Sequence, residues 1–192
     1  MKKTILAVAM AAASFVATSA SAQEVTTDGS RAFGIDPYVG VMGGYERFDR
    51  APGRGIPATL PGGNRLDGGL VEGVVGVNVP LGSFFVGVEG NVSKGFVGDI
   101  DWQYGVSGRA GFRAGETALV YGKVGHQWVN FDRFGNDSPD FGATSYGVGA
   151  EVGPKFLGLD GLVKKEGVRV RLEVGTQDFD SVRPMIGLIG HF

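Results

Sequence analysis

Two histidines and a set of charged residues are the side chains in this sequence best suited to chemistry. His126 stands between Val124 and Trp128, on the apolar face of its segment. A histidine there would serve as the base of a lipid-facing hydrolase, which also needs a serine nucleophile and a carboxylate nearby. Position 128 is tryptophan where such an enzyme would carry serine in a His-x-Ser arrangement. The pattern therefore favours a histidine beside an interfacial aromatic ring, and we expect no catalytic residue.

Motifs for cofactors and metals are equally scarce. The segment GVGAEVG lacks the GxGxxG spacing and the following helix of a dinucleotide-binding loop. The segment NDSPD clusters oxygen ligands without EF-hand spacing and is typical of a turn. We therefore expect neither a cofactor nor a metal ion.

The charged residues alternate with apolar ones, which is the period of a β-strand with two unlike faces. In the segment 84–94, for example, Val86 and Val88 share one face and Glu89 and Asn91 share the other. Turn residues separate eight such segments. The expected strands are roughly 36–48, 69–79, 84–94, 101–114, 117–131, 143–155, 168–176 and 183–192, with connections at 95–100 and 177–182.

Alternation alone fits two folds, a soluble sandwich with its charges outside and a membrane barrel with its charges inside. The context of the pattern favours the barrel. One part of that context is the signal peptide described below, and another is glycine, since 35 of the 192 residues are glycine, more than double the ordinary share of roughly 7%. Glycine weakens a strand unless neighbouring groups crowd it, and a charged face rich in glycine suits a crowded lumen. Aromatic residues at the ends of the apolar faces, Trp102, Phe112 and Phe192, suit interfacial girdles. We predict an all-β fold, an eight-stranded antiparallel up-and-down transmembrane β-barrel.

The first 22 residues are typical of a secretory signal peptide. Lys2 and Lys3 precede an apolar stretch over 5–17, and Ala20-Ser21-Ala22 provides a cleavage site. We predict cleavage near Ala22 by a Sec-type route, leaving residues 23–192 as the barrel domain. Without the two lysines, 16 basic residues (18 − 2) face 20 acidic ones, a formal charge of −4 (16 − 20). This acidity gives no support for nucleic-acid binding.

The signal peptide, the segment SYGVGAEVG and the terminal PMIGLIGHF together resemble the small outer-membrane barrels of the opacity-protein and outer-membrane-protein-A-like surface-antigen family. The resemblance implies a Gram-negative outer-membrane location, contact with outer-membrane lipid and a terminal strand read by the barrel assembly machinery. Phe192, Leu188 and Ile186 would form this assembly signal. His191 beside the final phenylalanine, and Gly187 and Gly190, depart from the family pattern.

If the apolar faces meet lipid, ten charged residues point inward, five acidic and five basic. An eight-stranded barrel is just wide enough for side chains to fill it, so buried charges must be paired. We therefore predict a salt-bridged plug in a monomeric barrel that is not an enzyme and has a structural or surface-interaction role with an unidentified surface ligand. The alternatives are a narrow channel for small solutes or ions and a lipid-modifying enzyme. The ten residues are Glu46, Glu72, Glu89, Arg109, Arg113, Lys123, Glu151, Arg169, Arg171 and Glu173.

Deleting Phe192 should lower the level of the protein in the outer membrane far more than it lowers the refolding yield in detergent. The reason is that the assembly machinery reads the terminal aromatic residue, whereas spontaneous refolding depends on strand pairing. Immunoblots of outer-membrane fractions, beside refolding yields of the same variant, make the measurement. A normal membrane level for the deletion would disprove the assembly signal.

Overall fold

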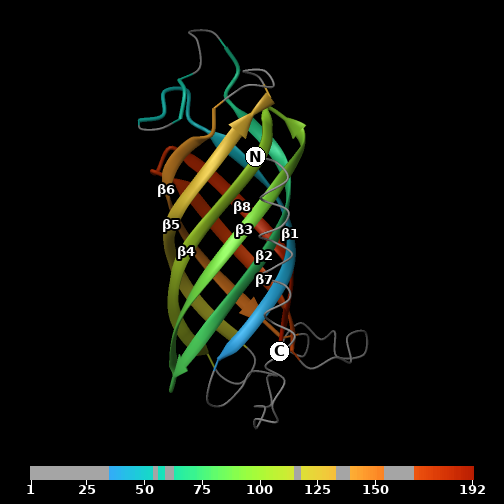
Figure 1. Cartoon of the computed structure of the whole chain (residues 1–192), viewed down its shortest axis with the longest axis vertical. Coiled ribbons are helices and arrows are strands. Elements are labelled where there is room, and N and C mark those ends of the chain that lie inside the picture. The colour runs from blue at the N-terminus through green and yellow to red at the C-terminus, as the bar shows by residue number, and fades with distance from the viewer. Residues whose placement is uncertain (1–34, 54–55, 59–62, 115–117, 133–138, 154–166) are drawn as a thin grey trace.

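Eight strands close into one antiparallel barrel in the structure, a computed structural model that describes residues 35–53, 56–58, 63–114, 118–132, 139–153 and 167–192 (Figure 1). Each strand pairs with the next along the chain, and the last pairs with the first. The predicted fold is therefore confirmed, while the predicted signal peptide lies outside the described residues. The strands are β1 (Asp36–Phe48), β2 (Asp67–Leu81), β3 (Phe84–Gly98), β4 (Ile100–Ala114), β5 (Ala118–Phe131), β6 (Phe141–Val152), β7 (Val168–Gln177) and β8 (Ser181–His191).

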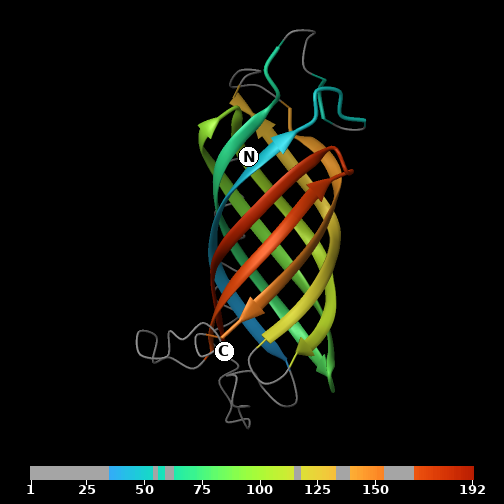
Figure 2. The same cartoon turned by 180° about the vertical axis from the view of Figure 1, so that it is seen from behind.

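The two ends of the barrel differ in their connections. The connections β1–β2, β3–β4, β5–β6 and β7–β8 lie at one end, which we call the loop end (Figures 1 and 2). The start of β1 and the end of β8 lie at the opposite end, which we call the terminal end. The connections at the loop end range from residues 49–66 between β1 and β2 to Asp99 alone between β3 and β4. Those at the terminal end range from Gly82 and Ser83 between β2 and β3 to residues 153–167 between β6 and β7.

One predicted connection is wrong. We expected residues 95–100 to link the third and fourth strands, but β3 continues to Gly98 and β4 begins at Ile100. Gly98 has a φ of 94°, which lets the chain reverse over Asp99 alone. The amide of Asp99 donates to the carbonyl of Asp67 over 2.6 Å. The sixth strand also ends earlier than expected, at Val152, and residues 154 and 155 lie outside the described part.

The seam between β8 and β1 closes the barrel, as predicted from the terminal apolar strand. Tyr38 faces His191 in an antiparallel register that runs to Gly44 and resumes at Arg47 and Phe48. The amide of Phe192 still donates to the carbonyl of Pro37 over 3.0 Å. The pairing is interrupted opposite Pro184, which has no amide proton to donate. The rest of the seam is paired, as a barrel in hydrocarbon requires.

Inward-facing glycines make room for large neighbours. A Cβ on Gly76 would lie 2.3 Å from the ring of Tyr38, and one on Gly149 would lie 2.5 Å from the ring of Tyr121. Real side chains do not tolerate such distances, so these two positions must be glycine while the tyrosines point inward. This crowding explains why the polar face is rich in glycine.

An apolar cluster fills the lumen at the loop end. Ile56 and Leu66 reach it from the β1–β2 connection, and Phe48 and Phe131 meet edge to face with ring centroids 5.5 Å apart. Leu70, Ile100, Val129 and Ala143 complete this loop-end cap. The cap places a dry layer between the lumen and the loop-end solvent.

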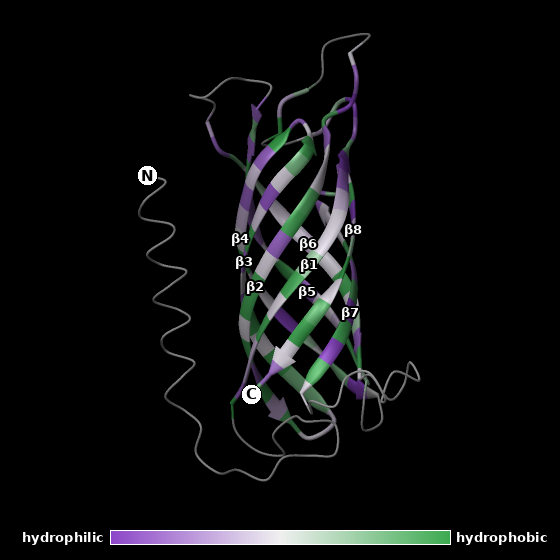
Figure 3. Cartoon of the chain, turned by 90° about the vertical axis from the view of Figure 1, so that its right-hand side faces the viewer, coloured by the Kyte–Doolittle hydropathy of each residue, from purple (hydrophilic) through white to green (hydrophobic). Residues whose placement is uncertain are grey.

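The outer wall is apolar. Figure 3 shows hydrophobic and hydrophilic residues alternating along the strands, and the outward set includes Val39 on β1, Val71 on β2 and Val88 on β3, each about half exposed or more. Among the described residues, no helix is long and apolar enough to cross a membrane.

Val88→Arg should lower the free energy of unfolding in lipid vesicles by about 2–4 kcal/mol, since Val88 points outward from β3 and a charge there must enter hydrocarbon. Val88→Leu, which keeps the site apolar, is the matched control and should change little. Urea titrations of vesicle-inserted protein, followed by tryptophan fluorescence, measure both. Equal stability of the two variants would mean that this face does not meet lipid.

Candidate functional site

Twelve ionisable side chains are buried inside the described part of the barrel and form what we call the lumen network. Six are carboxylates, and five are lysine or arginine. The twelfth is His191, whose side chain has no exposed surface. The carboxylates are Asp36, Glu46, Glu72, Glu89, Glu151 and Glu173, and the cations are Arg109, Lys123, Arg169, Arg171 and Arg183.

Glu89 is one of two hubs of the network. It projects inward from β3 because it follows Val88, which points outward. Its Oε2 lies 2.5 Å from Nη1 of Arg171 and 3.4 Å from Nη1 of Arg109, and its Oε1 lies 3.1 Å from Nζ of Lys123. The hydroxyl of Tyr38 donates a further hydrogen bond of 2.8 Å. Three cations and a phenol thus compensate the desolvation of one carboxylate.

Glu151 on β6 is the second hub. Arg171 donates to its Oε1 from Nη2 over 2.7 Å and from Nε over 3.0 Å, and Arg109 donates from Nη2 over 2.9 Å. Arg109 and Arg171 therefore each bridge Glu89 and Glu151. The guanidinium of Arg109 also lies 3.9 Å from the ring centre of Tyr121. The two like charges sit close together because two carboxylates and the face of a ring surround them.

His191 connects the network to the seam. Its Nδ1 lies 3.2 Å from both carboxylate oxygens of Asp36, and its Nε2 lies 2.8 Å from Oε2 of Glu151. Only an imidazolium can donate from both ring nitrogens, and two carboxylates within hydrogen-bond distance favour that form. In that form His191 supplies the sixth cation, and the buried charges of the described residues balance at six against six.

Toward the loop end, neutral donors replace part of the cationic partners. Glu46 accepts hydrogen bonds from Gln103 over 2.6 Å, Ser181 over 2.7 Å and Gln177 over 3.2 Å. Glu72 accepts from Ser93 over 2.7 Å and from Asn91 over 2.9 Å, and Arg183 lies 3.3 Å away. These contacts join residues of six strands, so the network ties the wall together around its circumference.

The structure brings together nine of the ten charged residues predicted to point inward. The tenth, Arg113, is only half-buried near the terminal end of β4, and no ion pair is found for it among the described residues. Its position at the mouth of the barrel explains this, because solvent reaches the end of the strand. The sequence prediction omitted Asp36, Arg183 and His191, although all three share the inward phase of their strands.

The three residues predicted to form the assembly signal lie on the outer wall. Ile186, Leu188 and Phe192 are each more than half exposed. Their part in assembly stays a prediction.

His126 also lies on the outer wall, half-buried against Trp128 with ring centroids 4.5 Å apart. The nearby carboxylate of Asp140 accepts instead from the hydroxyl of Tyr104 over 2.7 Å and from Asn130 over 3.0 Å. No hydrogen bond joins His126 to a hydroxyl or a carboxylate in the described part of the chain. Nor do three described histidine, aspartate or glutamate side chains gather as a metal site.

Comparison with known proteins finds solved membrane-barrel structures of low similarity. No protein-family model matches the chain, and no curated protein matches it. Neisserial surface protein A is 11% identical with a TM-score of 0.49, over 83% of this chain and 99% of that chain. Ail of Yersinia pestis, solved with the heparin analogue sucrose octasulfate, is 18% identical with a TM-score of 0.45, over 81% and 97%. A de novo designed transmembrane β-barrel is 12% identical with a TM-score of 0.48, over 85% and 99%. Likeness at these levels says nothing about what this chain binds, and the opacity-protein family stays a prediction.

Arg171→Met should lower the free energy of unfolding by about 3–5 kcal/mol, because it leaves Glu89 and Glu151 short of a shared cation in a buried site. Arg113→Met is the matched control, since it removes an inward-phase arginine for which no ion pair is found in the described structure. Urea titration in the same detergent measures both variants. If the two lose equal stability, the pairing at the hubs is not what stabilises the barrel.

Proposed function

We propose that this chain is a bacterial outer-membrane β-barrel that is not an enzyme, has a closed lumen and has a structural or surface-interaction role. The observation that carries the proposal is the inverted polarity of the wall. Twelve ionisable groups lie inside, while valine, leucine, isoleucine and phenylalanine are exposed outside. A water-soluble barrel places these groups the other way round, whereas a barrel in lipid needs this arrangement.

A closed lumen is favoured over a channel by two features. The buried charges balance and are paired across the lumen, so no single sign of charge lines a path for ions. The loop-end cap then closes the lumen with apolar side chains. A conducting barrel would need a continuous wet path, and eight strands leave little room for one beside these side chains.

The alternative of a lipid-modifying enzyme is weakened by the surroundings of His126. A hydrolase needs a nucleophile within hydrogen-bond reach of its base and a third group that orients the base. Asp140, the carboxylate of this region, is bonded to Tyr104 and Asn130. His126 instead packs on Trp128, as a residue of an interfacial aromatic belt would.

The β1–β2 and β2–β3 connections favour one orientation of the barrel. We infer that the loop end, with the long β1–β2 connection, faces the cell exterior and that the terminal end, with the two-residue β2–β3 turn, faces the periplasm, as in outer-membrane barrels with longer extracellular loops. The β6–β7 connection at the terminal end, residues 153–167, is long for a periplasmic turn. The β1–β2 connection, from Asp49 to Leu66, would then be available to a surface ligand. The barrel assembly machinery would meet the chain at β8, and lipid would surround a monomer.

Protein refolded into a planar bilayer should show no steady large conductance, because the paired charges and the loop-end cap leave no wide path. Heat-modifiable migration on gels and protection of the strands from protease in vesicles confirm that the sample is folded and inserted. Steady conductance from such a sample would favour the channel. Failure of folded protein to insert would overturn the membrane location itself.

A further inference from the structure

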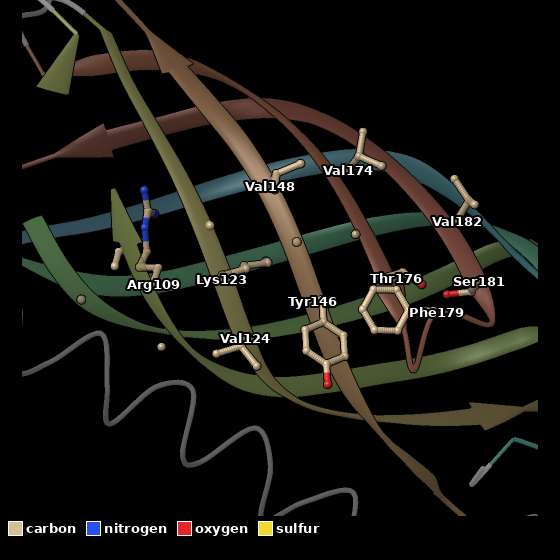
Figure 4. A pocket seen from close by; sticks show the side chains of 16 residues that line it. Arg109, Lys123, Val124, Tyr146, Val148, Val174, Thr176, Phe179, Ser181 and Val182 are labelled. Carbon is tan, nitrogen blue, oxygen red and sulfur yellow. The ribbon is translucent and has the colours of Figure 1, made fainter. Parts of the chain in front are cut away.

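A groove of about 840 Å³ crosses the outer wall over β4, β5, β6 and β7 (Figure 4). Each of these strands contributes three consecutive residues, at 108–110, 122–124, 146–148 and 174–176. The middle residue of each triple belongs to the inward-facing set. The outward-facing residues are uncharged, with Val124, Val148 and Val174 among them. The size is within the range of about 300–1,000 Å³ for small-molecule sites.

The strand register gives the groove its direction. Gly108 faces Val124, Val124 faces Tyr146, and Tyr146 faces Thr176. This row crosses three strand spacings of roughly 4.8 Å, or about 14 Å in all. It starts in the middle of β4 and ends beside the turn between β7 and β8. The groove is therefore elongated and leads from mid-wall to the loop end.

The floor of the groove is low because Gly108 and Gly122 lack side chains. A Cβ on either residue would meet nothing closer than 3.9 Å. The packing of the chain itself therefore does not require glycine here, unlike at Gly149, where the ring of Tyr121 would lie 2.5 Å away. What these two glycines leave open is space outside the barrel.

The loop-end side of the groove is aromatic and carries a hydroxyl. Phe179 stacks on Tyr146 with ring centroids 4.6 Å apart, and its φ of 65° is a left-handed conformation uncommon for such a residue. Thr176 lies beside this pair, and its Oγ1 is buried with no hydrogen-bond partner in the described structure. An apolar trough thus ends at an aromatic pair near the rim of the wall.

We propose that the groove binds one acyl chain of a membrane glycerolipid, with the ester end of the chain beside Tyr146 and Phe179 and the tail over Gly108 and Gly122. This inference rests on the proposed membrane location, and the groove is continuous with the wall that would face lipid. A second copy of the chain fits less well, because two convex walls meet along a line. The mouth of the groove is also small beside the roughly 1,000 Å² that a specific protein interface buries.

The test compares four variants of the full barrel. Gly108→Leu and Gly122→Leu fill the groove, whereas Gly73→Leu and Gly90→Leu place the same side chain on outward positions of β2 and β3 outside it. All four sites are equally open, with no neighbour closer than 3.9 Å. Each protein is refolded in detergent, incubated with dipalmitoylphosphatidylglycerol and examined by native mass spectrometry for bound lipid.

The wild type and the two control variants should retain one lipid per barrel, and the groove variants should retain it about tenfold more weakly, the factor expected when roughly two methylene groups are displaced. Equal retention by all variants, or none by a folded and inserted wild type, would overturn the acyl-chain site while leaving the membrane location intact. A dimer that Gly122→Leu abolishes, without bound lipid, would overturn the acyl-chain site and show that a second copy of the chain occupies the groove.

Failure of the wild type to insert into vesicles would instead contradict the proposed function.

Discussion

The pairing of Glu89 and Glu151 with Arg109 and Arg171 is the interaction on which the rest of the barrel depends. A charge that leaves water loses several kcal/mol of hydration, and only close partners of opposite sign offset that loss. Each arginine meets both carboxylates, so no member can be removed without exposing the others. The inward face can therefore carry charges, which leaves the apolar residues for the outer face.

This network also explains where glycine is needed. Tyr38 bonds to Glu89 and Tyr121 bonds to Glu173, and both rings must lie flat against the wall to do so. Gly76 and Gly149 provide the flat wall behind them. Charge pairing, tyrosine orientation and glycine content therefore depend on one another.

The sequence predicts the fold well because alternation of apolar and polar residues is a local property that survives folding. It also predicts most of the inward charges, since each follows from the phase of its strand. It cannot predict partners, because Glu89 and Arg171 are 82 residues apart and meet only through the register of the closed barrel. Arg183 and His191 lie on the inward phase of the last strand and could have been found by continuing the alternation to the chain end. The single-residue β3–β4 connection could not, because it depends on the backbone conformation of Gly98 and on register shifts near Gly69 and Ile100.

The charges on the two strands of the β8–β1 seam affect how the barrel closes. On its inward face β1 carries two acidic residues, Asp36 and Glu46, and β8 carries two basic ones, Arg183 and the protonated His191. Before closure, an open sheet would carry like charges along each free edge, and like charges face each other unfavourably across paired strands. Pairing of β1 with β1 or of β8 with β8 from two molecules is therefore disfavoured, whereas β8 is attracted to β1. The charges on the two edges thus disfavour the joining of like edges during the slow, long-range step that completes the sheet.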